Sequence, residues 1–159
     1  MEGTGYSGAK ALVELHEKHL RSFLATWREA KNRQVVLPKA KDRAYRSLET
    51  LLWHVLDCAS RYISWTADAL ELPPPTLPEL PGEDKIAFEA DGILEAILTA
   101  WRLPLSDLPV KAFVAGEHKA WWGTAYCVDA MLEHAVMHPL RHQWQLKKLL
   151  GHSERPELP

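Results

Sequence analysis

The chain has 159 residues, of which 47% are hydrophobic and 25% charged, and these proportions are typical of a soluble globular protein. Its formal charge of −2 provides no basic field for nucleic acid, and no run of about 18 apolar residues offers a membrane span, so neither partner is expected. This length fits one domain whose core needs no disulfide, and we expect a single domain over residues 1–159 with flexible ends at 1–7 and 152–159.

The start of the chain and its cysteines both favour a reducing compartment. Residues 1–8 are polar and glycine-rich, unlike a secretory signal. Cys58 and Cys127 each lie within an apolar helical pattern, which is typical of buried free thiols rather than a disulfide. We therefore expect a cytoplasmic protein.

Four segments place apolar residues at helical spacing, and each is predicted to be a helix. They cover about residues 8–31, 47–70, 83–103 and 124–150. Ser7, Ser47 and Thr124 are suited to cap three of these helices, because a hydroxyl can accept a hydrogen bond from a free backbone N–H. Gly151 is the predicted stop of the last helix.

The segments between these helices complete the predicted fold. Residues 72–82 contain five prolines, and proline in a helix interior lacks the N–H donor and clashes with the preceding turn. They predict a semi-rigid connector, long enough to cross between helices that are not neighbours. Residues 110–115 are the only predicted strand. The fold class is therefore all-α, a four-helix bundle with a long crossover connector.

Three histidines near the chain end are the strongest indication of chemistry. His134, His138 and His142 are four residues apart, so on a helix neighbouring pairs share a face, one turn apart. Neutral imidazole is the commonest side-chain metal ligand, and two at this spacing can hold one ion. Pro139 stands between the second and third histidines and predicts a bend. Either neighbouring pair, His134 with His138 or His138 with His142, could bind the ion.

A third ligand has to come from another helix, and His54 is the best candidate. It lies in the middle of the second helix among core-type residues, where an imidazole must be hydrogen-bonded, bound to a metal or turned to solvent. Three neutral histidines with an open position suit zinc, nickel or ferrous iron. A carboxylate-bridged di-iron site is disfavoured because no Glu-x-x-His occurs in the chain.

Taken together, His54 and the run His138-Pro-Leu-Arg-His142-Gln-Trp-Gln145 resemble the DinB/YfiT-like superfamily of four-helix-bundle metalloenzymes. In that family one histidine comes from the second helix, two come from a His-x-x-x-His near the chain end, and a glutamine commonly follows three residues later. The resemblance implies that His54, His138 and His142 are metal ligands and that Gln145 is the trailing glutamine.

The chain also departs from the family pattern. Gln143-Trp144 replaces the usual Arg-Gly, and Pro139 is unusual within the motif. An alternative register uses His134 and His138 as the ligand pair.

The resemblance covers nearly the whole chain in architecture and implies a function. Members similar to this chain include thiol-dependent S-transferases and isomerases and self-protection proteins. The implied protein is a mononuclear metal-dependent S-transferase or hydrolase, which adds a low-molecular-weight thiol or water to a small electrophilic substrate. The implied cofactor is a divalent ion, nickel or zinc before iron or manganese, and the implied assembly is a homodimer. The alternative is a non-catalytic four-helix bundle that binds a metal or a small ligand.

Four further side chains are candidates for supporting roles around the ion or the substrate. Asp57 is suited to orient a ligand histidine or to act as a base, since metal-bound imidazoles usually donate their other N–H to a carboxylate or carbonyl. Arg61 and Arg141 are candidate anchors for a substrate carboxylate, and Gln145 is a candidate partner of the centre.

The remaining histidines are predicted to lie at the surface. His16 and His19 stand among charged residues of the first helix, which is typical of a solvated helix face. His118 falls in an irregular passage and His152 in the tail.

Overall fold

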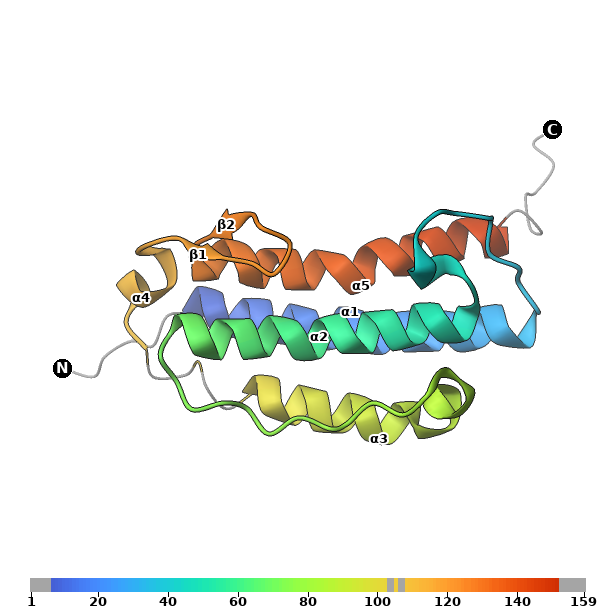
Figure 1. The fold of residues 1–159 in the computed structure, drawn as a ribbon, viewed down its shortest axis with the longest axis horizontal. Helices are drawn as coiled ribbons and strands as arrows, with labels where there is room; N and C mark the ends of the chain where they lie inside the picture. The colour runs from blue at the N-terminus through green and yellow to red at the C-terminus, as the bar shows by residue number, and fades with distance from the viewer. Residues whose placement is uncertain (1–6, 103–104, 106–107, 152–159) are drawn as a thin grey trace.

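The computed structural model describes residues 7–102, 105 and 108–151, and helices dominate this part of the chain (Figure 1). The long helices are α1 Ser7–Asn32, α2 Leu48–Ala69, α3 Glu83–Arg102 and α5 Val128–Gly151. A short helix, α4 Val110–Val114, and a 3-10 turn, η1 Arg43–Tyr45, lie between them. The all-α prediction is confirmed. Residues 1–6 and 152–159, predicted to be flexible, lie outside the described residues.

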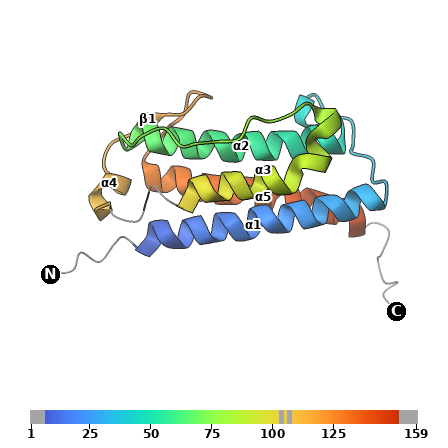
Figure 2. The same ribbon diagram turned by 90° about the horizontal axis from the view of Figure 1, so that it is seen from below.

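The four long helices form a bundle of two parallel pairs, and the two pairs run in opposite directions. α1 packs mainly against α5, while α2 packs against both α3 and α5. α1 and α5 run one way, and α2 and α3 run the other way (Figures 1 and 2). Because α2 and α3 are parallel neighbours, the proline-rich connector returns along the bundle before α3 begins. The connector thus joins neighbouring helices, whereas its length had suggested helices that are not neighbours.

The bundle interior is apolar, and tryptophan N–H groups tie its helices together. Trp27 on α1 donates to the carbonyl of Leu48 at 2.6 Å, and Trp101 on α3 donates to that of Ala59 at 3.0 Å. Buried indoles normally find such a partner. The largest fully buried side chains come from every long helix: Leu20, Phe23, Leu51, Leu52, Leu56, Ile63, Ile86, Ile97, Leu98, Trp101 and Met131. None of the described helices combines the length and apolar character needed to cross a membrane.

The start of α2 agrees with the prediction, whereas the starts of α1 and α5 differ from it. The Ser47 hydroxyl accepts a hydrogen bond from the Thr50 N–H at 3.0 Å, so Ser47 is the N-cap of α2 as predicted. Ser7, the predicted cap of α1, is already the first residue of that helix. Such a difference of one residue is within the usual uncertainty of helix ends.

The passage before α5 is the largest departure from the predicted elements. Residues 110–115, predicted as a strand, form α4, because a single helical turn after Pro109 buries Phe113. The strands are β1 His118–Lys119 and β2 Ala125–Tyr126, which pair antiparallel. Thr124 is part of this hairpin, where its carbonyl accepts the Ala120 N–H at 2.8 Å, and it is not the cap of α5. α5 begins at Val128, and the Cys127 carbonyl accepts the Met131 N–H at 3.1 Å.

Candidate metal centre

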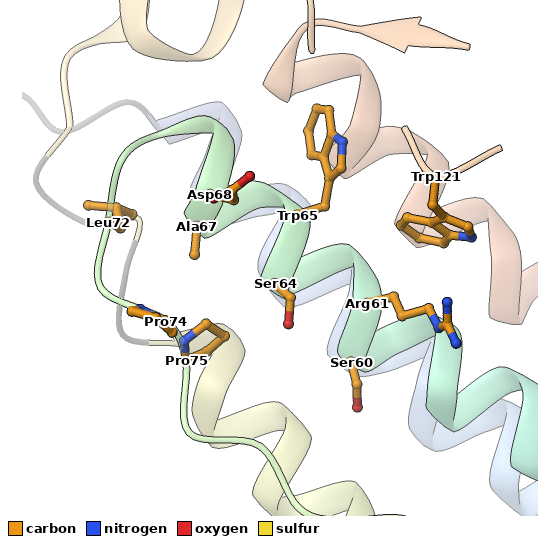
Figure 3. Close-up of a pocket in the computed structure, with 10 residues that line it drawn as sticks. All are labelled: Ser60, Arg61, Ser64, Trp65, Ala67, Asp68, Leu72, Pro74, Pro75 and Trp121. Carbon is orange, nitrogen blue, oxygen red and sulfur yellow. The ribbon is translucent and has the colours of Figure 1, made fainter. Parts of the chain in front are cut away.

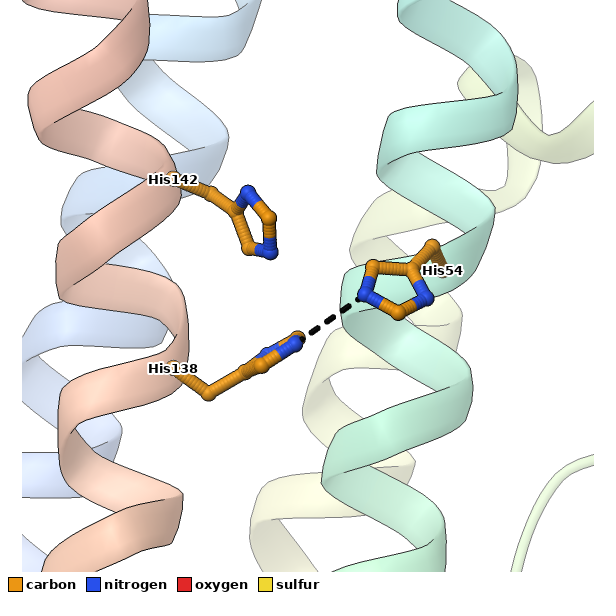
Figure 4. Close-up of side chains that lie close together, drawn as sticks. All are labelled: His54, His138 and His142. Atoms are coloured by element: carbon orange, nitrogen blue, oxygen red, sulfur yellow. Dashed lines mark hydrogen bonds between the residues drawn. The ribbon is translucent and has the colours of Figure 1, made fainter. Parts of the chain in front are cut away.

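Three imidazoles from two helices converge between α2 and α5 (Figure 4). His54 comes from α2, and His138 and His142 come from successive turns of α5. One nitrogen from each ring lies within 4.8 Å of the others. The Nε2 atoms of His54 and His138 are 3.1 Å apart. Two nitrogen ligands about 2.1 Å from one tetrahedral ion are about 3.4 Å apart, so the closest pair already has a suitable separation.

Burial keeps all three rings neutral. The pKa of His138 falls to about 2, first through burial and then through repulsion from His142 and His54. Burial lowers the pKa of His142 to about 4, although its hydrogen bond to Gln145 opposes this shift. Burial also lowers the pKa of His54. Near pH 7 each imidazole therefore keeps a nitrogen lone pair, which is the form that binds metal ions.

Gln145 fixes the orientation and tautomer of His142. The Oε1 atom of Gln145 lies 2.8 Å from Nδ1 of His142. Because an amide oxygen only accepts hydrogen bonds, Nδ1 must carry the proton, and Nε2 then keeps its lone pair. Metal-binding histidines usually have such an outer partner. The trailing glutamine predicted from the motif thus contacts a candidate ligand directly.

Tyr45 in turn contacts Gln145, and the sequence did not predict this role of Tyr45. Its hydroxyl lies 3.3 Å from Oε1 and 3.2 Å from Nε2 of Gln145. Tyr45 belongs to η1, whose N-cap Asp42 accepts the Ala44 N–H at 2.9 Å. The Asp42 charge also acts on the centre, where it raises the pKa of His54 and His142 against the larger effect of burial. The Asp42 cap could have located this turn from sequence, but not its packing against α5.

His138 has no such outer partner. Its Nδ1 atom is buried without a hydrogen-bond partner among the described residues. The ring is held by its neighbours instead, with the Tyr62 ring centre 5.6 Å away and that of His142 4.7 Å away. Its Nε2 atom is therefore the only nitrogen of His138 with a close polar contact among the described residues, and that contact is His54.

Cys58 lies beside the centre as a thiol. Its Sγ atom is 3.8 Å and 3.9 Å from the two ring nitrogens of His54. Burial raises its pKa to about 12, so the sulfur is protonated and is a poor metal ligand as it stands. Both cysteines are free, as predicted, but Cys127 is only half-buried because it lies at the turn before α5.

Asp57, Arg61 and Arg141 lie outside the cluster of imidazoles. Asp57 accepts a hydrogen bond from Arg61 at 2.7 Å, and no hydrogen bond links it to a histidine among the described residues. Arg61 lines a separate hollow of about 510 Å³, beside Trp121 (Figure 3). Arg141 is exposed on α5, next to Trp144. The structure therefore places neither arginine in contact with the three rings.

His134, the ligand of the alternative register, belongs to a different cluster. It stacks on Trp122 at 5.0 Å between ring centres and also contacts Tyr62 and Tyr126 at 5.6 Å and 5.7 Å. The structure brings His142, and not His134, toward His54. The Trp121–Trp122 turn of the hairpin covers this aromatic cluster.

The prediction of a solvated His16 is wrong. His16 is fully buried and stacks on Trp101 with 3.9 Å between ring centres. It shares the core-facing side of α1 with Leu20 and Phe23, at helical spacing, whereas Leu15 turns partly to solvent. Neither ring nitrogen of His16 has a hydrogen-bond partner among the described residues. Burial lowers its pKa to about 3, so the ring is neutral.

His19 and His118 are half-buried rather than at an open surface, and His152 lies outside the described residues. The indole of Trp65 covers one side of His118, with 5.9 Å between ring centres.

In comparisons with known proteins, no family model, no curated protein and no solved structure matches this chain.

Proposed function

We propose that His54, His138 and His142 bind one divalent metal ion and that the protein is a metal-dependent enzyme acting on a small electrophile. The supporting observation is the convergence of three neutral imidazoles from two helices within 4.8 Å. Three histidines suit nickel or zinc first, and iron or manganese next, and they leave a coordination position open. When bound, such an ion lowers the pKa of a coordinated water or thiol and so makes a nucleophile near pH 7.

The roles of the protein's own groups follow from their contacts. His54, His138 and His142 would hold the ion through nitrogen lone pairs that burial keeps free of protons. Gln145 holds the Nδ1 proton of His142 and thus keeps Nε2 directed at the centre. S-transfer from a low-molecular-weight thiol follows the DinB/YfiT-like resemblance of the motif, and hydrolysis is the reaction expected if water takes the place of the thiol.

A non-catalytic metal or ligand carrier is the second candidate, and one observation favours it. Among the described residues, no carboxylate forms a hydrogen bond with any of the three histidines, and Asp57 is paired with Arg61. Among the described residues, no carboxylate is therefore held against the three rings, where a general base would be expected.

Metal analysis of protein purified without an affinity tag tests the shared proposal. We expect about one equivalent of a divalent ion in the wild type and a loss of that ion in the double variant His138→Ala, His142→Ala. His134→Ala is the matched control, because it removes an imidazole one turn away on the same helix. Substoichiometric metal that is unchanged in the double variant would refute the site.

A panel of thiols and electrophiles then separates the two candidates. Metal-dependent turnover with a thiol or with water supports the enzyme. If the metal-loaded protein turns over no electrophile in a broad panel, the carrier is the better description.

Exposed apolar side chains on α5 support the homodimer that belongs to the same proposal. Met137 and Trp144 are 53% and 60% exposed and lie on one side of the helix, with Leu140 between them. Light scattering after size exclusion tests this assembly, and a monomer of 18.1 kDa at high concentration would refute it.

A further inference from the structure

A second hollow of about 430 Å³ adjoins the three-histidine centre on the side away from the hairpin. It lies between the C-terminal half of α5 and the segment that joins α1 to η1, which passes over α5 in Figure 1. Leu51 and Leu146 are its buried floor. Its volume falls within the range of about 300–1,000 Å³ that is usual for small-molecule sites.

The walls of this hollow are almost entirely apolar. Besides the leucine floor they comprise Leu37, Pro38, Ala40 and Leu149, all of them partly or largely exposed. The few polar side chains along it are those of Tyr45, Gln145 and Lys148. An apolar cavity with a few placed polar groups is the usual composition of a ligand site.

The segment that passes over the hollow is rich in basic residues, although the whole chain carries −2. Residues 37–46 contain four basic side chains against one carboxylate, and Lys148 of α5 lines the hollow itself. The basic side chains of the segment are Lys39, Lys41, Arg43 and Arg46. This distribution attracts an anion and repels a cation.

The hollow also shares two side chains with the metal centre. Tyr45 and Gln145 line it, and the same two residues are hydrogen-bonded to each other beside His142. An occupant of the hollow would therefore contact the pair that orients a candidate metal ligand.

We propose that this hollow binds a small amphiphilic acid, with its apolar chain on Leu51, Leu146 and Leu149 and its anionic group at Lys148. The apolar walls exclude a fully polar anion such as phosphate, because such an ion would lose its water without gaining hydrogen bonds. The ligand is a free acid in solution, and its binding needs no metal ion.

Chemical-shift mapping of the full, metal-stripped chain tests the proposal with octanoate as the probe. We expect saturable shifts of the backbone amides of Leu37, Leu51, Leu146 and Leu149 and of the side-chain amide of Gln145. Octylammonium has the same chain with the opposite charge, and we expect it to bind about fivefold more weakly, which is the upper end for one solvent-exposed charge contact.

Three variants localise the binding. Lys148→Gln should weaken octanoate binding by up to about fivefold, while Lys147→Gln, the adjacent lysine outside the hollow, should leave it unchanged. Ala40→Trp should abolish binding, because the exposed Ala40 lines the hollow and an indole there can occupy it. An unchanged melting temperature confirms that each variant is folded.

Several results would overturn the proposal. They are equal affinity for octanoate and octylammonium, octanoate shifts confined to the hollow at Arg61 and Trp121, or undiminished octanoate binding by folded Ala40→Trp. Lys148-dependent sedimentation with phosphatidylglycerol vesicles, without binding of monomeric octanoate, would make the region a membrane contact instead. Because the titration uses metal-free protein, a missing metal site leaves the result unaffected.

Discussion

This bundle buries imidazole in two places, and the two differ in what surrounds the ring. At the three-histidine centre, His142 has an outer hydrogen-bond partner in Gln145, and its ring faces two others. His16, on α1, is more deeply buried, but it stacks on Trp101 alone and no described residue hydrogen-bonds to it. Both rings have strongly lowered pKa values. Burial and a lowered pKa are therefore common to both places, and what distinguishes the candidate ligands from His16 is the convergence of three rings.

Removal of a single candidate ligand should show the largest difference in metal affinity between the two places. His54→Ala should reduce zinc or nickel affinity by more than the about 10–100-fold that follows the loss of an outer partner, since it removes one of three metal–nitrogen bonds. His16→Leu should leave the affinity unchanged. Competition with a chromogenic chelator measures both, and equal losses would mean that the three-histidine centre has no special role.

The outer partners are expected to give the next largest effect. Gln145→Leu should weaken metal binding by about 10–100-fold, because His142 loses the contact that fixes its tautomer and orientation. Tyr45→Phe should weaken it less, because it removes only the hydroxyl that contacts Gln145. The same chelator competition measures the change in metal affinity. Recovery of affinity in Gln145→Glu, which keeps an acceptor for Nδ1–H of His142, would show that Gln145 acts by orienting His142 and not by packing alone. Wild-type affinity in both variants would show that the Tyr45–Gln145 pair has no part in the centre.

For His16 the expected effect is on the stability of the folded chain. Replacement by leucine, which is similar in size, removes a buried N–H that lacks a partner among the described residues. The free energy of unfolding should rise by about 1–2 kcal/mol, the usual cost of such a group less the lost stacking on Trp101. Chemical denaturation measures this gain. A decrease would indicate that His16 is hydrogen-bonded to water or to a residue outside the described ranges.

The smallest effect expected is a change in pH dependence. His16 has a pKa of about 3 in the folded chain, well below the value of about 6.5 for an unfolded histidine. Between these values the unfolded state binds a proton that the folded state does not, so stability is full above about pH 6.5 and falls as the pH decreases.

In His16→Leu, the slope of the unfolding free energy against pH, between pH 5 and 6, should accordingly fall by about 1.2 kcal/mol per pH unit, because the unfolded histidine is only partly protonated there. Urea titrations of metal-free protein at several pH values measure this slope. An unchanged slope would mean that His16 titrates alike in the folded and unfolded chains.

Residues within one helix were the most predictable part of the candidate site. Helical geometry alone places His138 and His142 one turn apart, and Gln145 lies within reach of His142 for the same reason. His54 was predictable as an imidazole in an apolar stripe, although only the packing of α2 against α5 brings it to 3.1 Å from His138.

Elements outside the long helices were the least predictable. The β-branched residues at 110–115 favoured a strand, but one turn that buries Phe113 competes successfully with that local preference. The charged neighbours of His16 favoured a solvated helix face, whereas its helical spacing with Leu20 and Phe23 turns it into the core.

What the sequence determined by itself is the periodic part of the molecule: four amphipathic helices, the break at the prolines and the spacing of His138, His142 and Gln145. The tertiary structure alone decided that His142 rather than His134 faces His54, that Tyr45 supports Gln145, and that an apolar hollow lies beside them. The physical reason is how far apart along the chain the interacting residues are. Helical spacing follows from backbone geometry a few residues apart, whereas those contacts depend on how α2, α5 and the segment before η1 pack across the bundle.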